Sequence, residues 1–240
     1  MTAYFNWPEE FLNRDLTTIR EQASACQRCG LCETRQQVVF GQGPVPCDIM
    51  LIGEAPGADE DEQGIPFVGR AGQLLSKILE SVDIKRPTDI YIANTIKCRP
   101  PDNRVPTPAE TLACAPWLSA QLLIVKPKIL LLAGTPALKA ILSEQLADKE
   151  TISKVRGRWF KLPVPYMDEP LFVMPLFHPS YLLHNPSKEP GSPKALMWQD
   201  VKEVRGALDF IRKVKSPDVI LANAGIQGGA AGTGFPLARE

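Results

Sequence analysis

The sequence has no excess of charge of either sign, no targeting segment and no apolar run long enough to cross a bilayer. Lysine and arginine together number 27, as do aspartate and glutamate. The net charge therefore does not point to a polyanionic partner, and any nucleic-acid surface has to come from local clustering. The first residues, MTAYFNWPEEFLNRDL, lack the basic and apolar regions of a signal peptide. We therefore expect a cytoplasmic protein without a membrane partner.

The chain is also free of internal repeats, and its 240 residues suit one α/β domain with an ample core. We expect that domain to span residues 1–217. Residues 218–240 are rich in glycine and alanine and have little to bury, which predicts a flexible tail.

Short apolar runs alternate with stretches of helical periodicity along most of the chain. The runs that predict strands are 49–52, 90–96, 128–133 and 171–177, and the stretches that predict helices include 16–25, 72–82, 108–125 and 195–214. This alternation predicts an α/β fold, with a mainly parallel sheet and helices on both faces. The basic and aromatic segment 149–167 predicts a hairpin or an irregular crossing.

The stretch from Asp48 to Gly72 organises the chain, because its apolar run ends abruptly in the loop GEAPG. This loop lacks the GK[ST] ending of a phosphate-binding loop. Polar residues stand at the ends of three of the predicted strands: Glu54 with Ala55, Asn94 and His178. Each has an ordinary explanation as a turn, cap or surface residue. Because parallel strands end at the same edge of a sheet, the sequence predicts that the three positions form one pocket.

Four of the six cysteines form two groups that suit a tetrahedral thiolate site. Cys26 and Cys29 have C-x2-C spacing, and Cys98 and Cys114 can meet because the intervening loop doubles back. Zinc and an iron–sulfur cluster both remain open for such a site. Cys32 extends the first pair to C-x2-C-x2-C, but no nearby C-P continues it as in bacterial ferredoxins.

Three sequence motifs resemble those of the type 4 uracil-DNA glycosylases, the iron–sulfur branch of the uracil glycosylase superfamily. They are GEAPG followed by PFVG, NTIKCRPPDNR, and FHPSYLLHNPS, within a resemblance that extends from Cys26 to Phe210. The resemblance implies a three-layer α/β/α sandwich around a four-stranded parallel sheet. It also implies one four-iron four-sulfur cluster, held by Cys26, Cys29, Cys98 and Cys114.

The resemblance further implies a base-excision-repair enzyme that flips uracil out of DNA and hydrolyses its N-glycosidic bond, leaving an abasic site. His178 is expected to donate a hydrogen bond to the departing base, and Glu54 to orient the water. The amide of Asn94 can accept uracil and reject cytosine, whose hydrogen-bonding edge is reversed. We expect a monomer that associates with the nucleoid through uracil-containing DNA.

The other expected contacts surround the base and the DNA strand. The backbone at Gly53 and Ala55 can bind oxygens of the base, Phe67 can stack on it, and Glu60 can shape the pocket against the methyl group of thymine. Expected DNA contacts are the wedge Ser180, Tyr181 and Leu182 with Leu183, and cations that include Lys97, Arg99, Arg104, Lys154, Arg156 and Arg158.

Two alternatives belong to different classes of protein. One is a relative that binds uracil covalently; that branch carries a basic insertion with a histidine after the second motif, and residues 97–108 contain none. The other is a non-catalytic iron–sulfur module that binds nucleic acid or carries electrons. The presence of Glu54, Phe67, Asn94 and His178 together argues against it.

Overall fold

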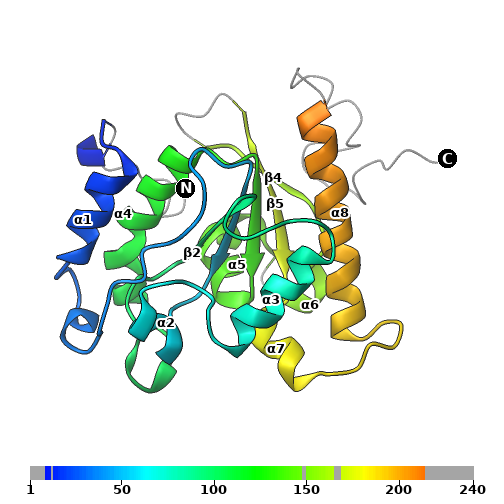
Figure 1. The fold of residues 1–240 in the computed structure, drawn as a ribbon, viewed down its shortest axis with the longest axis horizontal. Coiled ribbons are helices and arrows are strands. Elements are labelled where there is room, and N and C mark those ends of the chain that lie inside the picture. Colours follow the sequence, from blue (N-terminus) through cyan, green and yellow to red (C-terminus); the bar gives the residue numbers. More distant parts are fainter. Residues whose placement is uncertain (1–8, 12, 148–149, 165–168, 214–240) are drawn as a thin grey trace.

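The centre of the structure is a five-stranded sheet with the strand order β2-β1-β3-β5-β4 (Figure 1). The structure is a computed structural model that describes residues 9–11, 13–147, 150–164 and 169–213. Its strands are β1 Ile49–Gly53, β2 Ile90–Asn94, β3 Ile129–Ala133, β4 Phe160–Leu162 and β5 Leu171–Leu176. The four long strands are parallel, as predicted. The fifth strand, β4, corrects the expected count, since it pairs antiparallel with β5 at the edge of the sheet.

Helices cover both faces of this sheet, which confirms the predicted three-layer α/β/α arrangement (Figure 1). One face packs against α3 Arg70–Glu80, α7 Pro179–His184 and α8 Pro193–Lys213, and the other against α4 Pro108–Val125, α5 Thr135–Leu142 and α6 Ile152–Val155. Every residue of the four long strands is buried. Burial on both faces explains why these strands are continuous apolar runs without polar alternation.

A third apolar cluster lies beside the sheet, between α1 Leu16–Ser24 and α4. It contains Phe11, Ile19 and Trp117 together with two of the cysteines expected to bind metal, Cys98 and Cys114. The amino-terminal segment is therefore packed onto the domain at the place where the cysteines gather.

Helix boundaries follow the local signals in the sequence. Thr107 caps α4 by accepting a hydrogen bond from the Glu110 amide, with Pro108 at the first helical position. The helices predicted at 72–82 and 195–214 begin two residues earlier than expected. The sequence did not predict α2, Ala58–Gln63, in the acidic part of the loop after β1.

The remaining elements are short. Segment 149–167 contains α6 and β4, and the antiparallel pairing of β4 with β5 makes it the first arm of a hairpin. Short 3-10 helices occupy Glu9–Phe11, Gly30–Glu33, Pro101–Asn103 and Ser143–Gln145. The predicted tail at 218–240 lies outside the described residues. Among the helices that are described, none combines the length and the apolar character needed to span a membrane.

The strand register places the predicted functional residues at one edge of the sheet. Gly53 at the end of β1 pairs with Asn94 at the end of β2, and Ala133 pairs with Leu176 two residues before His178. Loops that carry polar groups therefore meet where parallel strands end, which is the position of ligand sites in open α/β sheets.

Candidate active site and cysteine cavity

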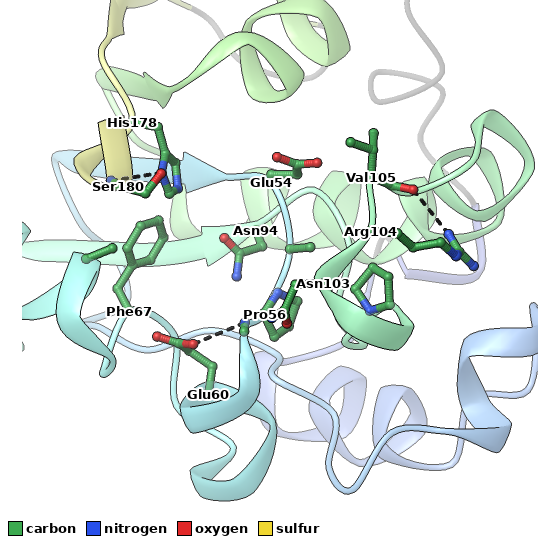
Figure 2. Close-up of a pocket in the computed structure, with 14 residues that line it drawn as sticks. Glu54, Pro56, Glu60, Phe67, Asn94, Asn103, Arg104, Val105, His178 and Ser180 are labelled. Carbon is green, nitrogen blue, oxygen red and sulfur yellow. Dashed lines mark hydrogen bonds between the residues drawn. The ribbon is translucent and has the colours of Figure 1, made fainter. Parts of the chain in front are cut away.

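A cavity of about 350 Å³ opens at this edge of the sheet. The structure brings Glu54, Phe67, Asn94 and His178 together in its wall, although they come from four separate segments (Figure 2). Ala55, Glu60 and Ser180 also line it, so most of the pocket expected from the sequence is assembled in one place. A cavity of this size accommodates a small planar ligand.

Backbone hydrogen bonding determines the tautomer of His178. The Ser180 amide donates to Nδ1 at 3.2 Å, and the Ser180 hydroxyl oxygen lies 2.7 Å from the same nitrogen. An amide N–H can only donate, so Nδ1 is an acceptor and the proton of the neutral ring resides on Nε2. Burial lowers the pKa of His178, which keeps the ring neutral, while the nearby Glu60 carboxylate opposes this shift. The site thus has a neutral imidazole whose Nε2–H is available as a donor.

Asn94 has an amide oxygen that is buried and has no hydrogen-bond partner among the described residues. The whole residue is only 2% exposed. A Cβ atom at Gly53 would lie 2.4 Å from this oxygen and 2.5 Å from the Phe67 ring. Glycine at position 53 therefore lets Asn94 and Phe67 approach each other. An unpaired buried acceptor costs about 1–3 kcal/mol, so a ligand that donates to it recovers that energy.

Phe67 is held in a left-handed backbone conformation, with φ 54°. Arg86 donates from Nη1 to the Phe67 carbonyl and from Nη2 to the Pro66 carbonyl, each at 2.7 Å. Gly72 packs so closely that a Cβ atom there would lie 1.9 Å from the Phe67 carbonyl oxygen. The ring lies 5.8 Å from the His178 ring between centroids. Arg86 was not predicted, because its partners are backbone carbonyls that lie 19 and 20 residues away along the chain.

The two carboxylates of the cavity have different surroundings. Burial raises the pKa of Glu54, and no described residue donates a hydrogen bond to its carboxylate. Its backbone carbonyl is fixed by the Thr95 hydroxyl at 2.6 Å and the Ile96 amide at 3.1 Å. Glu54 therefore presents an available carboxylate from a rigid backbone.

Glu60 instead accepts three backbone hydrogen bonds, from the amides of Gly57 at 3.0 Å and of Val68 and Gly69 at 2.9 Å each. These bonds tie α2 to the segment that carries Phe67. Both oxygens of Glu60 are engaged, so its carboxylate acts as a brace for the pocket wall.

Three predicted DNA contacts are corrected, two by burial of the side chain and one by an ion pair to a buried carboxylate. Leu182 is fully buried and cannot act as a wedge. Lys97 is 1% exposed, with Nζ donating to the Asn94 carbonyl and to Gln121 Oε1 at 2.6 Å each. Arg156 forms a two-pronged ion pair with the buried Asp200. Each of these side chains contacts other parts of the protein. The residue type alone could not show that it would do so and not contact DNA.

The other predicted contacts remain near the surface. Tyr181 is 45% exposed, and its ring packs on Phe177 with 5.1 Å between centroids. Arg99 donates to Asn103 Oδ1 at 2.8 Å, and Arg104 is paired with Glu110. Arg158 is paired with Glu150.

The four cysteines Cys26, Cys29, Cys98 and Cys114 line a second, smaller cavity between α1 and α4. Three of their sulfurs accept hydrogen bonds: Cys26 from Trp117 Nε1 at 3.3 Å, Cys98 from Arg35 Nη1 at 3.4 Å, and Cys114 from the Lys97 amide at 3.3 Å. Burial raises the pKa of Cys114 to about 12, so a bound metal would have to displace its proton. Cys32 and Cys47 do not line this cavity.

The donor set of these four cysteines bears on the kind of metal site. Within the described residues, no three histidine, cysteine or carboxylate side chains lie close enough to share one metal ion. A tetrahedral zinc ion holds its thiolates about 3.8 Å apart, given Zn–S bonds of about 2.3 Å. A polynuclear iron–sulfur cluster spaces its thiolates more widely and commonly accepts hydrogen bonds at sulfur. Four thiols around one cavity, three of which accept hydrogen bonds at sulfur, therefore fit the donor set of an iron–sulfur cluster.

Residues 40–202, more than half of the chain, match the family described as the Uracil DNA glycosylase superfamily. This chain belongs to that superfamily. It is 40% identical to the type-4 uracil-DNA glycosylase of Thermotoga maritima, over 81% of this chain and 94% of the relative. It is 36% identical to the type-4 uracil-DNA glycosylase of Sulfurisphaera tokodaii, over 79% of this chain and 83% of the relative. A type-5 uracil-DNA glycosylase of Mycobacterium tuberculosis matches 48% of the chain at 30% identity.

The superfamily match confirms the resemblance and spans the whole active-site cavity, from Glu54 to Ser180. It also includes Cys98 and Cys114, whereas Cys26 and Cys29 precede it. The matches to type-4 relatives extend over about four fifths of the chain.

Proposed function

We propose that this protein is a type-4 uracil-DNA glycosylase, which binds an everted uracil and hydrolyses its bond to deoxyribose. The observation that carries the proposal is the buried, unpaired amide oxygen of Asn94 in a cavity shared with Phe67 and His178. The membership of the superfamily and the names of the type-4 relatives support the same activity.

Base recognition follows from the hydrogen-bonding edge that Asn94 offers. Uracil has a ring N–H that can donate to the amide oxygen, and a carbonyl that can accept from the amide nitrogen. Cytosine has an acceptor and an amino group in these places, so it leaves the Asn94 oxygen unpaired. The Phe67 ring supplies the stacking surface, and the duplex has to release the nucleotide before it can enter.

Bond cleavage requires stabilisation of a negative charge on the departing base. The bond from the sugar C1′ to the base nitrogen breaks, and its electron pair passes to the uracil ring. Nε2–H of the neutral His178 donates a hydrogen bond to the carbonyl oxygen that gains this charge. A water held by Glu54 adds its oxygen to C1′ and gives a proton to that carboxylate, which completes hydrolysis.

The cysteine cavity is proposed to hold one four-iron four-sulfur cluster, on Cys26, Cys29, Cys98 and Cys114. The support is the set of four thiols around one cavity and the three hydrogen bonds to sulfur. When bound, the cluster supplies structural cross-linking. It would connect the segment before β1 with the loop after β2 and with α4, next to the active site.

DNA binding is proposed to involve few charged residues. Arg99 lies on the loop after β2, and the exposed Tyr181 lies on α7, which follows β5 at the edge of the sheet where the cavity opens. Arg104 is also at this edge, although its guanidinium is partly committed to Glu110. We further propose that the described domain acts as a monomer.

Uracil-containing single-stranded oligonucleotides, treated with alkali after incubation with the purified protein, test the activity. The wild-type protein is expected to produce strand scission at uracil and none at thymine or cytosine. Asn94→Ala is expected to lose scission, because the base is no longer fixed. His184→Ala is the matched control, since His184 is exposed and does not line the cavity.

The same assay separates the alternative functions. A protein–DNA adduct that survives denaturation, without scission, would identify a covalent uracil-binding relative. An absence of both scission and adduct, in a protein that retains visible absorbance, would support a non-catalytic iron–sulfur module. Either outcome would contradict the proposed glycosylase.

A further inference from the structure

Val105 is an apolar side chain in an unusual position. It is 72% exposed, more than Tyr181 at 45% or Trp198 at 46%, and it lines the active-site cavity. In Figure 2, Val105 lies on one side of the cavity and His178 and Ser180 on the other, with Glu54 between them. An exposed valine is common on protein surfaces, but one at the mouth of a base-binding pocket faces the DNA strand.

The backbone that precedes Val105 is held in a fixed turn. Asp102 and Asn103 both adopt left-handed conformations, with φ 53° and 54°. The Asn103 amide donates to the Pro100 carbonyl and the Arg104 amide to the Pro101 carbonyl, each at 3.1 Å. Arg99 also donates to Asn103 Oδ1. Prolines and local hydrogen bonds therefore order this turn before any ligand is present.

A second set of bonds fixes Val105 itself. Arg104 donates from Nη1 to the Val105 carbonyl at 3.2 Å, and it forms a two-pronged ion pair with Glu110 at 2.9 and 2.6 Å. Glu110 in turn belongs to the first turn of α4, where it accepts from the Thr107 amide at 2.7 Å. The Arg104 guanidinium lowers the pKa of Glu110 to about 2, so the pair is charged at neutral pH. The backbone of Val105 is thus anchored to α4 through Arg104 and Glu110. The β-branched side chain of valine also has few rotamers.

We propose that Val105 is a wedge that enters the base stack of duplex DNA beside the everted uridine, from the side of the pocket opposite Ser180 and Tyr181. This inference rests on the proposed glycosylase function. Everting a nucleotide leaves a gap in the stack, and an apolar side chain in that gap replaces part of the lost stacking at no cost in polar desolvation. A rigid support matters here, because ordering a flexible loop would consume the energy that the contact gains.

A wedge has a signature that a structural residue lacks. It supports reaction on duplex DNA, where the stack has to be opened, more than on a single strand, where it does not. Val105→Ser is expected to lower kcat/KM for uracil opposite adenine in a duplex by about tenfold, with a loss under about threefold on the same strand alone. Val105→Ile keeps the apolar contact and is expected to retain duplex activity within about threefold.

Leu112→Ser is the matched control. Leu112 is 63% exposed on α4, close to Val105 in the sequence, but it does not line the cavity. This variant is expected to match the wild-type protein on both substrates.

Four results would overturn the inference. An unchanged duplex rate for Val105→Ser would show that no contact is lost, and an equal loss on duplex and single strand would indicate support of the pocket. A loss of the same size in Leu112→Ser would indicate a general surface effect. A wild-type protein that is inactive on both substrates would overturn the proposed function as well. If the wild-type protein is active, the other three results count against the wedge alone.

Discussion

A single backbone amide sets the tautomer of the His178 imidazole that its proposed role requires. The Ser180 N–H occupies Nδ1 and so leaves the proton on Nε2, while burial keeps the ring from gaining a second proton. A neutral donor of this kind can stabilise charge on a departing base without first being protonated. Ser180 is therefore a positioning residue, a role that its place after the FHP sequence did not indicate.

His178→Ala is expected to lower kcat for uracil release by about 10² to 10³, the usual effect of removing one donor to a developing oxyanion. Binding of the uracil-containing strand should change much less, because the donor acts mainly in the transition state. Single-turnover kinetics at saturating enzyme measure this. His184→Ala, the change of the second of the two histidines, should behave as wild type; a loss of equal size there would contradict the assignment.

Glu54→Gln is expected to lower activity and raise stability at the same time. Burial raises the pKa of Glu54 above its ordinary value of 4.5, so the folded protein binds this proton more tightly than the unfolded chain. Stability from this group is therefore present below pH 4.5 and lost as pH rises through the folded pKa, which leaves the full penalty at pH 7. The glutamine carries no such penalty.

The measurement is thermal unfolding of both proteins across this pH range, beside kcat. The melting temperature of Glu54→Gln should exceed that of wild type at pH 7, and the difference should shrink as pH approaches 4.5. Activity should fall by about 10² to 10⁴, the range for loss of a general base. A variant that is both inactive and less stable at pH 7 would instead give Glu54 a structural role.

Among single residues, the sequence predicted the functional groups at strand ends. It did not predict the roles that depend on tertiary packing. Glu54, Asn94 and His178 each follow a strand, so topology alone predicted that they meet. Arg86 supports Phe67 through backbone carbonyls, and Leu182 is turned into the core. Neither fact is encoded in residue type or in spacing.

Among the elements, the segment after β2 connects the two cavities. Asn94 ends the strand, and Lys97 and Cys98 follow within four residues. Lys97 Nζ donates to the Asn94 carbonyl, while the Lys97 amide donates to the Cys114 sulfur. The backbone of Asn94, the proposed base-binding residue, is therefore joined to the proposed cluster site through one buried lysine.

Cys98→Ala is expected to abolish the visible absorbance of the cluster and to lower the melting temperature, because a structural metal site contributes folding energy. Cys32→Ala is the matched control from the neighbouring cysteine run. Since Cys32 does not line the cavity, this variant should keep both properties. Loss of absorbance in Cys32→Ala, or an unchanged melting temperature in Cys98→Ala, would contradict the proposed ligand set or its structural role.

Elements with strong local signals were predicted well, and weak ones were not. The cap at Thr107 and the proline after it marked the start of α4 within the chain. Strand β4 has three residues and owes its existence to pairing with β5, a tertiary contact. Helix α2 consists of Ala58, four acids and Gln63, and the sequence did not predict it. Three of its acids lie in the first turn, where the helix macrodipole favours negative charge.

For the whole molecule, the balanced charge limits how strongly DNA can be attracted. Lys97 is buried, Arg156 is ion-paired with the buried Asp200, and Arg104 and Arg158 are paired with carboxylates, which leaves few predicted cations for phosphate contact. We expect the logarithm of the DNA-binding constant to fall with a slope of about −1 to −3 against the logarithm of salt concentration, for one to three phosphates. Fluorescence anisotropy with an inactive His178→Ala protein measures it.

A slope near zero would contradict binding through phosphates. A slope steeper than about −6 would require many more phosphate contacts than the described surface offers, and would place a cationic surface elsewhere.

If Cys98 holds an iron–sulfur cluster as proposed, its short distance along the chain from Asn94 would link iron supply to uracil repair. If the cysteine cavity is filled only when iron is plentiful, cells deprived of iron would accumulate chains in which the support beneath Asn94 is loosened. Deaminated cytosines would then persist, and the rate of C-to-T mutation would rise with iron starvation even though the amount of polypeptide stayed the same.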